Sequence, residues 1–159
     1  MYERILKQYD PTAENLLFIL HDIQDNDPQQ YIPEQAIREV SDYLNISPGQ
    51  IYSVITFYSL YSVSPRGKYI IRVCDSPPCH LMGSVSIIDV LEEILGINVG
   101  ETTQDGMFTL EITSCLGVCG VAPAVMINKE LYGNLNPEKI SMVIDKYRKN
   151  KQPVQPVIE

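Results

Sequence analysis

The chain of 159 residues lacks any apolar stretch that approaches the ~20 residues a membrane-spanning helix needs. It is also poor in basic residues, because 12 Lys and Arg stand against 20 Asp and Glu, which gives a formal net charge of −8. Binding to nucleic acid needs clustered Lys and Arg, so this balance argues against a nucleic-acid partner. Residues 1–7 lack the apolar core and the cleavage site of a signal peptide. We therefore expect a cytoplasmic protein without direct membrane insertion.

Several functional motifs are missing as well. The sequence contains no GxGxxG motif and no P-loop, so we do not expect it to bind a nucleotide directly. It contains no CxxC motif, which a dithiol oxidoreductase places at the start of a helix. Of its two histidines, only His80 lies beside a cysteine, whereas His21 has none nearby. A Rieske centre needs two histidines on one iron, so this pattern argues against one.

The four cysteines form two close pairs in the sequence. Cys74 and Cys79 have four residues between them, and Cys115 and Cys119 have three. Each pair lies where an apolar, strand-like run gives way to a loop. Two loops that each carry two thiols can place four sulfurs around one inorganic centre. The spacing therefore predicts a cluster or a metal site.

The spacing favours a [2Fe–2S] cluster over the alternatives. Structural zinc sites commonly use CxxC pairs that direct both sulfurs at a single ion, and both pairs here are wider. In a [2Fe–2S] cluster each iron takes two thiolates at opposite ends of a larger core, which suits wider loops. Two disulfides are a poorer fit for a protein expected in the cytoplasm. The zinc and disulfide interpretations both remain open.

Glycines accompany the second cysteine pair. Gly117 lies inside the pair and Gly120 directly follows it. Glycine lets backbone N–H groups approach sulfur closely, and such N–H groups stabilise the negative charge of a thiolate-bound cluster. We therefore expect Gly117 and Gly120 to support the cluster indirectly, by allowing backbone N–H groups to approach the sulfurs of its ligands.

The chain divides into a helical first part and a mixed second part. The sequence predicts a helix capped at Asp10 with Pro11 following it, a second helix after Pro33, and a third behind the capping box of Ser47 and Gln50. The second part predicts, in order, strand 68–73, helix 84–95, strand 107–113, strand 124–127, a short strand near 131–132 and helix 137–149. We expect an α/β fold in which a helical subdomain (1–64) precedes the cluster domain (65–150) and an extended tail (151–159).

One ordered set of motifs resembles a known family, the thioredoxin-like [2Fe–2S] subunit of NADH dehydrogenases (the NuoE family). The motifs that carry the resemblance are Cys74-x4-Cys79, Gly83, Gly100-Glu101-Thr102-Thr103, Asp105-Gly106, Cys115-Leu116-Gly117-x-Cys119-Gly120 and Ala122-Pro123, together with residues 51–58. Similar subunits occur in NAD-linked and electron-bifurcating [FeFe]-hydrogenases and in NAD-dependent formate dehydrogenases. The resemblance implies a thioredoxin-like ferredoxin domain preceded by a small helical bundle. It also implies that Cys74, Cys79, Cys115 and Cys119 bind the cluster.

The resemblance further implies an electron-transfer subunit that is inactive alone. Its partner would be a flavoprotein subunit with FMN, an NAD(H) site and an iron–sulfur cluster, within a larger complex. Among the possible complexes, we favour an NAD-reducing or bifurcating hydrogenase over a formate dehydrogenase or complex I. The alternatives are a non-redox adaptor stabilised by zinc and a free-standing thioredoxin-like ferredoxin.

Overall fold

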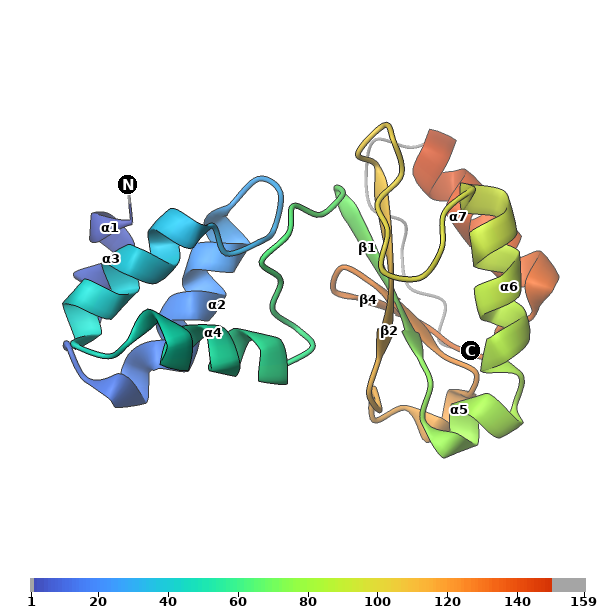
Figure 1. The fold of residues 1–159 in the computed structure, drawn as a ribbon. Coiled ribbons are helices and arrows are strands. Elements are labelled where there is room, and N and C mark those ends of the chain that lie inside the picture. The colour runs from blue at the N-terminus through green and yellow to red at the C-terminus, as the bar shows by residue number, and fades with distance from the viewer. Residues whose placement is uncertain (1, 150–159) are drawn as a thin grey trace. The chain divides into compact units, whose positions relative to one another are not determined.

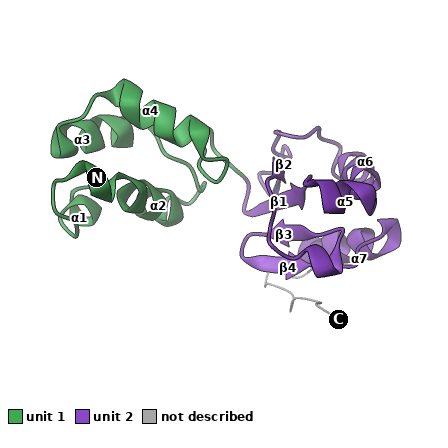
Figure 2. Cartoon of the chain, turned by 90° about the horizontal axis from the view of Figure 1, so that it is seen from below, with its two compact units in different colours: residues 1–66 green, residues 67–159 purple. Residues whose placement is uncertain are grey.

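The structure, a computed structural model, describes residues 2–149 and divides into two compact units, residues 1–66 and residues 67–159 (Figure 2). The described elements of unit 1 are all helical, and unit 2 combines a sheet with helices. The predicted α/β class is confirmed. The predicted tail, residues 151–159, lies outside the described residues. Within the described part, no helix has both the length and the apolar character needed to cross a membrane.

Unit 1 is built from four α-helices and a short 3-10 turn among its described residues. They are α1 (Glu3–Leu6), η1 (Ala13–Asn15), α2 (Leu16–Asn26), α3 (Glu34–Leu44) and α4 (Pro48–Phe57). Their apolar faces form one core that includes Ile19, Leu20, Ile37, Val40 and Ile51. The unit therefore has a hydrophobic core of its own.

The structure confirms one predicted helix start in unit 1 and corrects another. At α4 the Ser47 hydroxyl accepts from the Gln50 N–H at 3.3 Å, and the Ser47 N–H donates to Gln50 Oε1 at 3.1 Å, as the capping box requires. The predicted start of the first long helix at Asp10 is wrong. Thr12 is extended, with φ −122° and ψ 145°, so the chain turns through η1 before α2 begins at Leu16.

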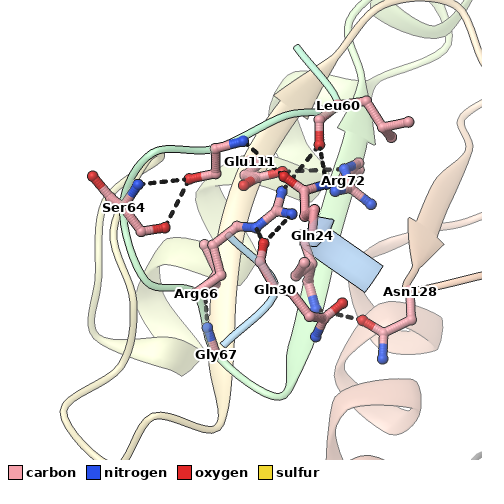
Figure 3. A network of polar contacts seen from close by, with 12 residues as sticks. Gln24, Gln30, Leu60, Ser64, Arg66, Gly67, Arg72, Glu111 and Asn128 are labelled. Carbon is pink, nitrogen blue, oxygen red and sulfur yellow. Dashed lines mark hydrogen bonds and ion pairs between the residues drawn. The ribbon is translucent and has the colours of Figure 1, made fainter. Parts of the chain in front are cut away.

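Polar side chains hold the segment after α4 against the helices of unit 1 (Figure 3). The Gln24 amide donates to the Leu60 carbonyl at 3.0 Å and accepts from the Ser62 N–H at 2.9 Å. The buried Arg66 guanidinium donates through Nε to the Gln30 carbonyl at 2.7 Å. These side chains donate to backbone carbonyls that lie outside any helix or strand. They thereby hold the last residues of unit 1 in place.

Unit 2 is a sheet with its two longest helices packed on one face (Figure 1). Its described elements are β1 (Tyr69–Cys74), α5 (Pro77–Leu81), α6 (Ser84–Leu95), β2 (Phe108–Thr113), η2 (Cys119–Val121), β3 (Val125–Ile127), β4 (Glu130–Tyr132) and α7 (Pro137–Lys149). The four strands of the described part lie in the order β2-β1-β3-β4. β1 and β2 are parallel, while β3 is antiparallel to both β1 and β4.

The core of unit 2 lies between the sheet and helices α6 and α7. Alternate strand residues such as Ile71, Val73 and Leu110 meet the apolar faces of both helices. Across β1 and β2, Arg72 and Glu111 are register partners and form an ion pair of 3.1 Å between Nε and Oε2 (Figure 3). Both side chains are largely buried, so the pair satisfies charges that would otherwise be costly at this position.

Candidate cluster site

The topology of the sheet brings the two cysteine-bearing segments to one edge. Cys74 is the last residue of β1, and its register partner is Thr113, the last residue of β2. Because these neighbouring strands are parallel, the segments that follow them leave the sheet at the same end. β3 begins at this end as well, and the Cys74 N–H donates to the carbonyl of Ala124 at 3.1 Å. Three segments distant in the sequence thus meet around the cysteines.

The first cysteine pair is connected by a short helix that was not predicted. The sequence indicated a loop after Cys74, whereas Pro77–Leu81 is helix α5 and contains Cys79. Ser76 precedes this helix, and Pro77 and Pro78 occupy its first positions. Proline is well suited to the first turn of a helix, because its fixed φ matches the helix and its missing N–H has no partner there. The sequence Ser76-Pro77-Pro78 therefore contained a local signal for the start of this helix.

The four thiols differ in exposure and are arranged in pairs. Cys74 and Cys79 are each 2% exposed, whereas Cys115 and Cys119 are exposed, with 3.9 Å between their Sγ atoms. Leu116 and Val118 of the second segment pack against Cys74 and Cys79 in one apolar cluster with Ala122 and Ala124. All four cysteines are free thiols. Within residues 2–149, no three His, Cys, Asp or Glu side chains converge in a way that would hold one metal ion.

Backbone N–H groups point at the sulfurs. The Gly117 N–H donates to Cys115 Sγ at 3.4 Å. Burial raises the pKa of the Cys74 thiol, but hydrogen bonds from the N–H groups of Ser76 and Leu116, together with those of Cys79 and the Ser76 side chain, outweigh burial, so its pKa lies below the usual value. Such bonds favour a thiolate over a thiol, and the thiolate is the form that binds metal.

The pKa values of the Cys79 and Cys119 thiols are raised instead. Burial and a hydrogen bond with Cys74 raise the pKa of Cys79, although the Ala124 N–H acts in the other direction. The hydrogen bond and charge interaction with Cys115 raise the pKa of Cys119. Cys79 and Cys119 therefore retain their protons more readily than ordinary thiols would. Binding of a metal centre would release these protons, as it does at thiolate sites in general.

The two glycines expected to support the cluster differ in conformation. Gly117 has φ +80°, a backbone conformation that residues with a Cβ adopt only with strain. An added Cβ would meet no heavy atom of the described residues within 4 Å. The backbone conformation, and not a lack of space, therefore favours glycine at this position. Gly120 has no such φ and an equally open surrounding. Its supporting role stays a prediction for which the backbone gives no special reason.

Replacing Gly117 should affect both stability and the cluster. We expect Gly117→Ala to lower the free energy of unfolding by about 1–2 kcal/mol, the usual cost of this backbone conformation for other residues. Relaxation of that strain would move the N–H away from Cys115 Sγ and shift the midpoint potential of the cluster. Potentiometric titration of the purified protein measures this shift.

Gly106 is the matched control for Gly117. It has φ +66° with equally open surroundings, and it precedes β2 at the end of the strand opposite the cysteines. Gly106→Ala should cost similar stability but leave the potential unchanged. Equal potentials in both variants would show that Gly117 is an ordinary turn residue.

A third glycine, which was not predicted from the sequence, supports the second cysteine segment by close packing. A Cβ on Gly133 would lie 2.5 Å from Val121 Cγ2 and 2.8 Å from the Val121 carbonyl oxygen. Val121 ends η2, which begins at Cys119, and its carbonyl accepts from the Asn134 N–H at 2.6 Å. The turn after β4 thus packs directly on the cysteine segment. No local signal could have indicated this contact, since it is tertiary.

The two histidines belong to different units. His80 Nδ1 lies 3.2 Å from Asp75 Oδ1 beside the cysteines. His21 belongs to helix α2 of unit 1, where its Nδ1 lies 3.7 Å from Asp25 Oδ2. Each imidazole therefore has a local acidic partner.

Comparison with known proteins assigns the family. The family model of the thioredoxin-like [2Fe-2S] ferredoxin matches residues 2–148 of the chain. The chain belongs to this family. Its cofactor is a [2Fe–2S] cluster, which confirms the cofactor predicted from the sequence. The sheet and helices of unit 2 are thus a thioredoxin-like fold, as the resemblance implied.

Individual relatives come from two kinds of enzyme. The chain is 39% identical over 146 residues to a subunit of the NADH-quinone oxidoreductase of Rickettsia felis, covering 91% of this chain and 87% of that protein. It is 32% identical over 117 residues to the HndA subunit of the NADP-reducing hydrogenase of Solidesulfovibrio fructosivorans, covering 74% of this chain and 68% of that one.

A solved structure shares the fold over most of the chain. An NAD+-reducing [NiFe]-hydrogenase in its air-oxidized state matches with a TM-score of 0.74 and 27% identity. The match covers 89% of this chain and 24% of the hydrogenase chain, so this protein corresponds to about a quarter of that longer polypeptide.

Proposed function

We propose that this protein is the electron-transfer subunit of an NAD(P)H-linked oxidoreductase complex and exchanges electrons with the FMN of a partner flavoprotein. The relatives support this proposal, because their names assign them to NADH-quinone oxidoreductase and to NADP-reducing hydrogenase. The observation that carries it is the meeting of two cysteine pairs at one edge of the sheet in a [2Fe–2S] family member. As an electron-transfer subunit, it would have no catalytic site of its own.

Cys74, Cys79, Cys115 and Cys119 are the proposed ligands of the cluster. Four thiols in two pairs match the two irons, each of which takes two thiolates. Backbone N–H groups already donate toward sulfur in both pairs, as the ligands of a negatively charged cluster require. The donor set and its surroundings therefore fit a [2Fe–2S] cluster.

The arrangement of the chain suits transfer of single electrons. When bound, a [2Fe–2S] cluster takes up and releases one electron at a time. The buried pair, Cys74 and Cys79, excludes water from one side of the site, and the exposed pair, Cys115 and Cys119, keeps the other side near the surface. N–H groups directed at the thiolates offset the negative charge that reduction adds. Electrons from a hydride donor can then leave a flavin one by one.

The identity of the complex stays a prediction. We favour an NAD-reducing or bifurcating hydrogenase, and HndA together with the hydrogenase structure supports that choice. The NADH-quinone oxidoreductase relatives support complex I instead. Purification of the complex from its native source distinguishes these assignments through the subunits that accompany the chain. The predicted cytoplasmic location also stays a prediction.

Dependence on a partner is the most direct test of this function. The isolated chain should neither bind NADH nor oxidise it, because its sequence contains no dinucleotide-binding motif. Its flavoprotein partner should oxidise NADH without it. Calorimetry with NADH and an absorbance assay of NADH oxidation measure the two activities. NADH oxidation by the isolated chain at a rate comparable to that of the complex would contradict the proposal.

A further inference from the structure

An apolar surface lies directly beside the proposed cluster ligand Cys79. Leu81, at the end of α5, is 84% exposed, and Met82, which follows it, is 63% exposed. Val85, in the first turn of α6, is 45% exposed. We call these three residues the α5–α6 surface. Large apolar side chains this exposed and this close together in the chain are unusual unless something covers them.

The position of the α5–α6 surface relates it to electron transfer. Helix α5 carries Cys79 two residues before Leu81, with its thiol buried among Cys74, Ala122 and Ala124. Figure 1 shows α5 at the same end of unit 2 as the segment that follows β2. A protein that covers this surface therefore lies directly beside a segment that carries a proposed cluster ligand.

Charge indicates the kind of partner. From Val73 to Leu95 the sequence contains no Lys or Arg, but it contains Asp75, Asp89, Glu92 and Glu93. Asp89 is exposed and lies one helical turn after Val85, on the same side of α6. The apolar surface therefore has an acidic margin. A complementary partner presents apolar side chains flanked by Lys and Arg.

From these observations we infer that the α5–α6 surface is the docking site for the flavoprotein subunit, through an apolar patch with a basic margin. This inference rests on the proposed function, since it assigns a surface to the partner named there. Docking at this surface would shield the cysteine-bearing end of the sheet from water. It would also shorten the distance that an electron travels between the flavin and the cluster. The apolar residues would supply the affinity, and Asp89 would accelerate and orient the encounter.

The test compares two exposed surfaces on the same unit. Leu81→Ser combined with Met82→Gln removes apolar area without adding charge near the cluster. Met142→Gln is the matched control, because Met142 is 57% exposed on α7, a helix that carries no cysteine. The probe is the purified FMN-containing subunit of the same complex, and its dissociation constant is measured by calorimetry.

We expect the double variant to raise the dissociation constant at least about tenfold and Met142→Gln to leave it within about twofold. Asp89→Lys should weaken binding at low salt and reduce the dependence of the association rate on salt. The visible spectrum and the iron content should match the wild type in all variants. Unchanged affinity of both the double variant and Asp89→Lys would overturn the docking site while leaving the function intact. Failure of the wild-type chain to bind the flavoprotein would overturn both.

Discussion

Cys115→Ala should remove the [2Fe–2S] cluster or leave it so labile that it is lost during purification. An iron of the cluster would lose one of its two thiolates. The wild-type protein, purified without oxygen, should contain about two irons and two sulfides per chain. The variant should contain far less of both, and its visible absorption should fall in proportion. Iron and acid-labile sulfide analysis measures this loss.

Ser114→Ala is the matched control, because it removes one polar atom from the adjacent position of the same segment. It should retain the iron and sulfide of the wild type. Full iron and sulfide content in Cys115→Ala would exclude Cys115 as a ligand. One zinc per chain and no sulfide in the wild type would contradict the cluster and support the zinc adaptor instead.

Gly133→Ala should destabilise unit 2 and loosen the cluster. The added methyl group cannot be accommodated in place, because it would meet both the side chain and the backbone oxygen of Val121 at less than 3 Å. Overpacking of this kind costs about 1–3 kcal/mol of folding stability. Because η2 connects Val121 to Cys119, the displacement reaches a proposed ligand. We expect a lower free energy of unfolding and faster loss of the visible spectrum in the presence of a chelator.

Gly49→Ala serves as the control for this substitution. Gly49 lies near the start of α4, has an ordinary φ, and an added Cβ there would meet no heavy atom of the described residues within 4 Å. Alanine favours a helix over glycine, so this variant should be at least as stable as the wild type. If Gly133→Ala keeps the cluster as long as Gly49→Ala does, the packing of the turn on η2 does not support the ligands.

Local chemistry made much of the fold predictable from sequence. The capping box of Ser47 and Gln50 starts α4, and the apolar residues of 84–95 followed by Gly96 define α6 with its left-handed C-cap. The strands that precede the cysteines fall where expected, and β1 is buried along its whole length. In each case the signal lies within a few residues of the structure that it determines.

The wrong predictions fall where tertiary contacts or competing local preferences decide. Asp10-Pro11 has the composition of a helix start, but Thr12 is extended and η1 intervenes. Ser76-Pro77 has the same composition and does start a helix, α5. Gly133 resembles any glycine after a strand, and only its contact with Val121 shows its role. The spacing of the cysteines predicted the kind of centre, whereas the parallel pairing of β1 and β2, which brings the pairs together, needed the structure.

Electron paramagnetic resonance on the chain mixed with its flavoprotein partner and NADH tests the proposed electron transfer most directly. We predict the signal of one reduced [2Fe–2S] centre per chain, matching the signal that dithionite produces in the isolated chain. NADH without the flavoprotein should give no signal. A cluster that dithionite reduces but that NADH and the flavoprotein never reduce would contradict transfer of electrons from the flavin to this protein.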